Sequence, residues 1–95
     1  MGKPTLRHLT GWEPWMAGAS HWIFELVGTL DNILGMGKTP QGIYLSEVLI
    51  RTALSPVVGE FGPPLTRCFG FPVHQTEDTA HVVDSDGVRH DFMAP

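Results

Sequence analysis

Histidine and acidic side chains gather in the last quarter of the chain, where they could support metal binding or proton transfer. His74, His81 and His90 lie there together with five of the chain's ten Asp and Glu residues. Imidazole and carboxylate groups are common zinc ligands. A metal-dependent or small-molecule site built from these three histidines and nearby acids is therefore one hypothesis for function.

The acidic turn at residues 84–87, DSDG, governs whether His81 and His90 can meet. A two-residue loop would place their imidazoles side by side, where they could chelate zinc. Aspartate at the first position and glycine at the fourth favour instead a type I turn followed by a G1 bulge. In that register His81 pairs with Asp91, and Val82 pairs with His90 on the other face. We therefore expect a half-buried His90 and a surface His81–Asp91 pair.

The single cysteine does not indicate a nucleophile. Cys68 would need a histidine within hydrogen-bond reach, and only His74 is near it in sequence. With Phe69 beside it, Cys68 is better explained as a small buried hydrophobe. The eleven glycines are dispersed and form no phosphate-binding motif. We therefore expect a protein that is not an enzyme, has no catalytic residues and requires no metal or other cofactor.

Aromatic surface is concentrated near the N-terminus, because all three tryptophans lie between positions 12 and 22. Trp22 belongs to an apolar helical stripe and is expected in the core. Trp12 and Trp15 precede that stripe in a segment with proline and glycine, and Met16 stands beside Trp15. Tryptophan and methionine are enriched at protein interfaces. Trp12, Trp15 and Met16 are therefore predicted to bind a partner; the alternative is that the two rings close one end of a small core.

Apolar residues recur at helical spacing in two segments, residues 20–34 and 40–54. Gly35 is a stop signal for the first helix. Thr39 suits the N-cap of the second helix, and Pro40 suits its first position. Because the connection between the segments is short, the two helices are predicted to pack as an antiparallel hairpin.

The second predicted helix is apolar over more than half of its circumference. One side of it would meet the first helix, so the surplus side needs another neighbour. Tyr44 and Ile50 belong to this apolar excess. Either the sheet or another protein chain could cover it, and we predict that Tyr44 and Ile50 belong to the partner-binding surface.

Short β-forming segments follow a loop that is rich in glycine and proline. Helices followed by strands predict an α+β fold, here an antiparallel helical hairpin followed by a small antiparallel β-meander of two or three strands. A chain of 95 residues is expected to form one small domain. Its helical part would cover about 10–55, its loop about 56–70 and its β part about 71–93.

Charge and composition argue against several functional classes. The net charge is −4, and the six Lys and Arg residues are scattered, so we expect no nucleic-acid binding. No segment approaches the roughly 20 apolar residues of a membrane span. A single cysteine and the absence of a signal-peptide pattern predict a reducing, cytoplasmic location.

Apolar excess without a catalytic pattern leads to the main hypothesis. We expect a small intracellular protein that acts by protein–protein interaction, as an accessory subunit, adaptor or inhibitor in complex assembly. Its partner would be another protein chain, in a hetero- or homo-oligomer. The alternatives are the histidine site for a metal or small molecule and a structural role as a shell or virion component.

Overall fold

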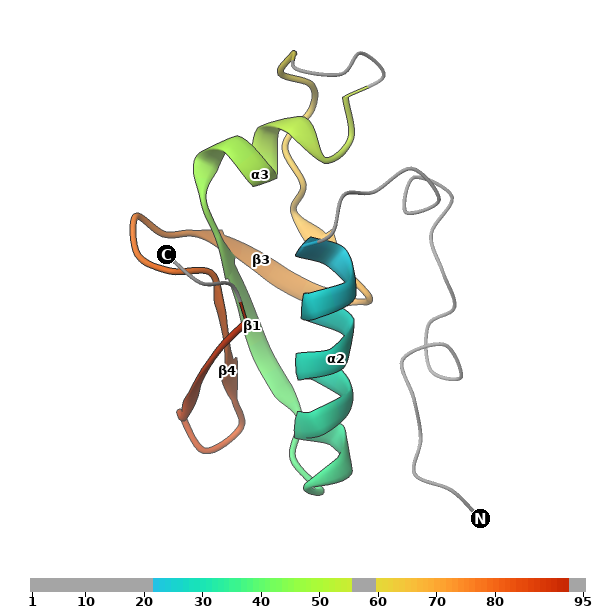
Figure 1. The fold of residues 1–95 in the computed structure, drawn as a ribbon, viewed down its shortest axis with the longest axis vertical. Coiled ribbons are helices and arrows are strands. Elements are labelled where there is room, and N and C mark those ends of the chain that lie inside the picture. The colour runs from blue at the N-terminus through green and yellow to red at the C-terminus, as the bar shows by residue number, and fades with distance from the viewer. Residues whose placement is uncertain (1–21, 56–59, 93–95) are drawn as a thin grey trace.

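The computed structural model describes residues 22–55 and 60–92, which form one mixed five-stranded sheet and two helices (Figure 1). Its elements in chain order are α2 (Trp22–Gly35), β1 (Pro40–Leu45), α3 (Glu47–Thr52), β2 (Arg67–Cys68), β3 (Phe71–Gln75), β4 (His81–Asp84) and β5 (Arg89–Asp91). The strand order across the sheet is β2-β3-β1-β4-β5. The expected helical hairpin followed by a β-meander is therefore wrong, although the small protein does combine helix and sheet.

Helix α2 confirms the first predicted helix over the described residues. Its apolar stripe is buried, and Leu26 and Leu30 are fully inaccessible to solvent. The helix ends in a Schellman motif, in which the amide of Lys38 donates to the carbonyl of Ile33 and Gly37 has φ +79°. Glycine adopts this left-handed conformation without steric cost, which explains why the helix stops here.

The second predicted helix is mostly wrong, because residues 40–45 form strand β1 and only Glu47–Thr52 are helical. Ile43 and Leu45 are fully buried and Tyr44 is only partly buried, which is the alternation of a strand. The helix cap is Ser46, whose hydroxyl accepts a hydrogen bond from the amide of Leu49 at 3.3 Å. Burial against neighbours from distant parts of the chain therefore overrides the helical spacing.

Strand β1 lies at the centre of the sheet and prevents the expected meander. It pairs in parallel with β3, where Tyr44 aligns with His74, and antiparallel with β4, where Tyr44 aligns with His81. Strands β3 and β4 are consecutive in the chain but lie on opposite sides of β1. The predicted β part therefore contributes three strands, β3 to β5, while β2 comes from the predicted loop and β1 from the predicted second helix.

The predicted hairpin register between β4 and β5 is confirmed. His81 pairs with Asp91 and Val82 pairs with His90. Within the turn, the amide of Gly87 donates to the carbonyl of Asp84 at 2.9 Å, and Gly87 has φ +80°. These are the features of a type I turn with a G1 bulge, as the DSDG sequence indicates.

The hydrophobic core lies between α2 and one face of the sheet, and α3 closes one end of it (Figure 1). Cys68 is fully buried there, as expected for a small hydrophobe. Phe69 follows it with φ +55° in a two-residue turn and is only 2% exposed. The left-handed backbone costs about 1–2 kcal/mol in a non-glycine residue. Burial of a phenylalanine ring stabilises by about 1.5–3 kcal/mol, which offsets that cost.

Candidate functional site

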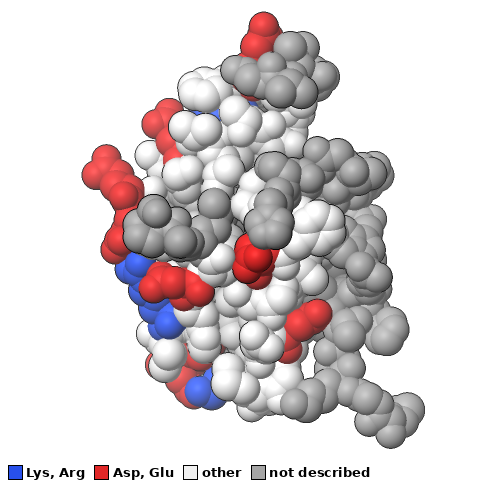
Figure 2. Space-filling view, in the orientation of Figure 1, with Lys and Arg blue, Asp and Glu red and all other residues white. Residues whose placement is uncertain are grey.

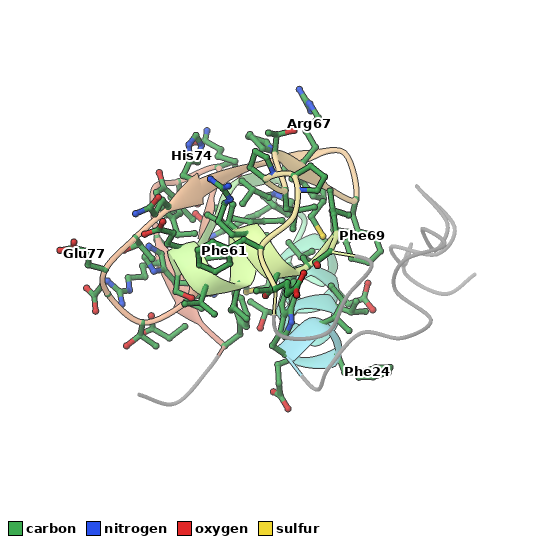
Figure 3. The ribbon with its side chains drawn as sticks, turned by 90° about the horizontal axis from the view of Figure 1, so that it is seen from above. Phe24, Phe61, Arg67, Phe69, His74 and Glu77 are labelled. Atoms are coloured by element: carbon green, nitrogen blue, oxygen red, sulfur yellow. The ribbon has the colours of Figure 1, made fainter. Side chains whose placement is uncertain are left out.

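One face of the sheet carries α2. No helix of the described residues lies on the other face, which we call the open face and which holds Arg67, Tyr44, His74, His81, Arg89 and Asp91. Figure 3 shows this arrangement from above: the labelled side chains of Arg67 and His74 point away from α2. The register places Tyr44 between His74 of β3 and His81 of β4. An open sheet face with a defined row of side chains is the best candidate for a functional surface in the described part of the chain.

The three rings of this row pack against one another. The centroid of Tyr44 is 4.7 Å from that of His81, with the two planes only 7° apart. On the other side, the centroids of Tyr44 and His74 are 5.0 Å apart and the planes are tilted by 33°. Because an imidazole lies on each side of the phenol, Tyr44 offers its ring edge rather than its ring face to a ligand.

Gly42 makes room for this packing. It lies two residues before Tyr44, so both positions project from the same face of β1. A Cβ atom at Gly42 would lie 3.1 Å from Cδ2 of His74 and 3.3 Å from Cε2 of Tyr44. The absence of a side chain therefore allows the two rings to lean across the central strand.

His81 is held in a single tautomer by the chain that leads into β4. Its Nδ1 lies 2.6 Å from the carbonyl oxygen of Thr79, so Nδ1 carries the hydrogen and donates. In the neutral ring, Nε2 is then an acceptor. His81 is only 7% exposed, so the expected surface pair with Asp91 is wrong. The stacked ring of Tyr44 covers His81, and the carboxylate of Asp91 binds Arg89 instead.

Charged side chains border the open face at β5. Arg89 donates from Nε to Asp91 at 2.7 Å and from Nη1 to Asp78 at 2.8 Å. The hydrogen bond from Arg89 is the main reason why the pKa of Asp78 falls to about 2, and the two carboxylates raise the pKa of Arg89. Two carboxylates for one guanidinium leave this border with one net negative charge. Figure 2 shows basic side chains beside acidic ones along the same margin.

A second cluster, formed by Asp84, His90 and Lys38, secures the β4–β5 hairpin. Asp84 is fully buried and accepts hydrogen bonds from Nε2 of His90 at 2.8 Å and from the amides of Asp86 and Val88. The hydrogen bond from His90 is the main cause that lowers the pKa of Asp84 to about 2. Lys38 lies 3.9 Å from the same carboxylate and 2.9 Å from Asp86. Since these bonds close the turn, we assign the cluster a structural role.

The three histidines of the metal hypothesis do not come together. His74 and His81 are two strands apart, about 10 Å at the usual spacing, whereas zinc ligands lie about 2 Å from the ion. His90 pairs with Val82, on the face that packs against α2. Within residues 22–55 and 60–92, no group of three His, Cys, Asp or Glu side chains could hold a metal ion.

The predicted partner-binding residues have different locations. Trp12, Trp15 and Met16 lie outside the described residues. Tyr44 lies at the centre of the open face, while Ile50 is 8% exposed and packs in the core. The sequence did not predict that His74, Tyr44 and His81 form a row, because the row depends on a parallel pairing between residues about thirty positions apart. The signal that the sequence offered was the strand alternation of residues 42–45, which puts Gly42 and Tyr44 on one face and Ile43 and Leu45 on the other.

A second exposed feature lies beside α3. Phe61 is 59% exposed, and the guanidinium carbon of Arg51 lies 5.6 Å from its ring centroid. Val48, at the start of α3, is equally exposed. An arginine over an aromatic ring stabilises by about 0.5–1 kcal/mol at an exposed site. The contact with Arg51 explains the exposed ring of Phe61 without a ligand. The open face is therefore the stronger candidate for a functional site.

The described residues form a small α+β protein with a mixed sheet that carries its described helices on one side. No family model matches the chain. No match was found among curated proteins or among solved structures either. Among the described residues there is no helix with the length and apolar character needed to cross a membrane.

Proposed function

We propose that this is a non-enzymatic protein that binds another protein chain through the open face of its sheet, as an accessory subunit, adaptor or inhibitor. The observation that carries the proposal is the row of His74, Tyr44 and His81 on a face that no described helix covers. Its side chains are already ordered by stacking and by the Thr79 carbonyl. Side chains ordered in advance lower the entropy cost of binding.

The chemistry of the row favours a protein partner over a nucleic acid. Single-stranded nucleic acids bind sheet surfaces by stacking bases on exposed aromatic faces. Here imidazoles occupy both sides of the Tyr44 ring. Phosphate binding needs several available cations. Of the two arginines on the open face, Arg89 already binds two carboxylates, and Arg67 donates from Nη1 to the carbonyl of Gly70 at 2.7 Å. Polar ring edges suit instead the mixed hydrogen-bonding surface of another protein.

The proposal keeps Trp12, Trp15 and Met16 as a further part of the contact surface, with a cytoplasmic location. Tryptophan and methionine are enriched at interfaces, and the single cysteine suits a reducing compartment. Replacing both Trp12 and Trp15 by alanine should abolish partner binding with little loss of stability. An unfolded double variant would show that the two rings belong to the core.

Site-specific photo-crosslinking tests the role of the open face. A photoreactive residue at His74, in the full-length protein in its native lysate, is expected to form one dominant covalent adduct with a protein. The matched control places the same residue at Asn32, an exposed position of α2. Equal labelling from both positions, or none from His74, would contradict the proposal.

A further inference from the structure

We propose that the partner attaches at strand β5, the border of the open face, by adding an extended segment as a sixth strand of the sheet. This inference rests on the proposed function and specifies which part of the partner binds. In strand addition, main-chain hydrogen bonds give affinity and the side chains of alternate residues give specificity. The mode requires an edge strand whose outward backbone groups have no partner.

The pairing of β5 with β4 leaves such groups on its outer side. The carbonyl of Val88 accepts from the amide of Asp84 at 3.0 Å, and the amide of Phe92 donates to a carbonyl just before β4 at 3.2 Å. Backbone groups alternate in direction along an antiparallel pair. The amides and carbonyls of Arg89 and Asp91 therefore point away from β4, and none of them is hydrogen-bonded to a described residue. They present two donors and two acceptors to an added strand.

The opposite edge of the sheet, β2, offers less. Its carbonyl neighbour Thr66 accepts from the amide of Val73, so the backbone groups of Cys68 point towards β3 and only those of Arg67 point outward. One outward residue gives an added strand one donor and one acceptor. Of the two edges, β5 is therefore the better template.

Charge on the open-face side of β5 favours a basic residue in the added strand. Asp78 and Asp91 both bind Arg89, which leaves one net negative charge. Their side chains are still 62% and 54% exposed, so a further cation can reach them. A residue directly opposite Asp91 projects from the same face, with the two Cβ atoms about 5 Å apart. Lysine or arginine at that position would balance the charge.

The other side of the edge favours apolar residues. Val88 is 48% exposed, and strand alternation places its side chain on the face opposite to Arg89 and Asp91. A residue directly opposite Val88 in the added strand would cover it. The segment that fits β5 therefore alternates apolar with polar residues and carries a cation opposite Asp91.

NMR titration of the full-length protein with the blocked peptide acetyl-Val-Lys-Val-Thr-Val-amide tests the inference. In the antiparallel alignment its lysine faces Asp91 and its last valine faces Val88. Amide exchange with solvent should slow at Arg89 and Asp91 as peptide is added, and should stay unchanged at Arg67. Asp91→Asn should weaken binding by about two- to fivefold, the range of a cross-strand ion pair. The matched control Glu60→Gln, at an exposed position outside the sheet, should bind like the wild type.

Methylation of the peptide nitrogens separates strand addition from charge attraction alone. The amides of the lysine and the threonine face β5, whereas that of the central valine faces away. N-methylation of the lysine and threonine should abolish the slowed exchange, and N-methylation of the central valine should preserve it. Equal binding of the two methylated peptides, slowed exchange at Arg67 instead of Asp91, or no slowing with the unmodified peptide would overturn the inference. A protein adduct formed from the His74 crosslinker would in that case leave the proposed function standing.

Discussion

Replacement of Glu47 by proline distinguishes the observed strand and helix from a continuous helix over residues 40–54. In the structure Glu47 is the first residue of α3, and Ser46 before it has φ −67° and ψ 157°. Proline suits the first helical position, and the residue before proline favours this extended conformation. The observed fold therefore accepts the change, whereas proline inside a helix costs about 3 kcal/mol or more.

The expected change in the free energy of unfolding is close to zero. Loss of the Glu47 charge near the helix N-terminus costs about 0.3–1 kcal/mol. Lower entropy of the unfolded chain with proline stabilises by about 0.4–1 kcal/mol. The two effects nearly cancel, so Glu47→Pro should lie within about 1 kcal/mol of the wild type. The matched control is Glu47→Ala, which removes the charge alone.

Urea and thermal unfolding followed by circular dichroism measure this difference. For a domain of this size, 1 kcal/mol shifts the midpoint temperature by about 4–8 °C, so interruption of a helix would lower it by about 12 °C or more. A loss of more than about 2 kcal/mol in Glu47→Pro relative to Glu47→Ala would refute the assignment of β1 and α3.

Three further changes test the core, the hairpin and its buried acid. Leu30→Ala should lower the free energy of unfolding by about 2–5 kcal/mol, because Leu30 is fully buried. The control Asn32→Ala, on the exposed side of α2, should lower it by less than about 0.5 kcal/mol. Equal losses of stability in the two variants would contradict the placement of α2. Gly87→Ala should lower the free energy of unfolding by about 1–2 kcal/mol in urea unfolding. The cost comes from the positive φ alone, because an added Cβ would meet no atom within 4 Å. An unchanged unfolding midpoint would contradict the assigned turn. The folded pKa of Asp84 lies at about 2, below the ordinary 3.8, so the stability from its bond with His90 is complete above about pH 4 and is lost as the pH falls to about 2. Urea unfolding should show the gap between wild type and Asp84→Asn closing over that interval; a gap independent of pH would refute this linkage.

Local features of this protein were predictable from sequence. The apolar stripe of α2 and the glycines after it specify a helix and its end through contacts within a few residues. The DSDG turn likewise specifies the β4–β5 register, because its hydrogen bonds join residues at most four positions apart. Short-range sterics and hydrogen bonding determine both.

Residues 40–45 show where local sequence is not sufficient. Ile43 and Leu45 satisfy a helical spacing when read with the residues that follow, and they also satisfy the alternation of a strand. Pairing with β3 and β4 decides between these periods, and both neighbours lie roughly thirty or more positions further along the chain. No pattern within residues 40–45 indicates that the neighbours exist.

The candidate site depends on the same distant pairings. Local sequence was sufficient to predict α2 and the alignment of His81 with Asp91. The position of Tyr44 between two imidazoles, the burial of His81 and the sheet face without a described helix follow only from how the strands assemble. The physical reason is that strand neighbours are chosen by burial and hydrogen bonding across the whole core, whereas caps and turns are chosen by their own few residues.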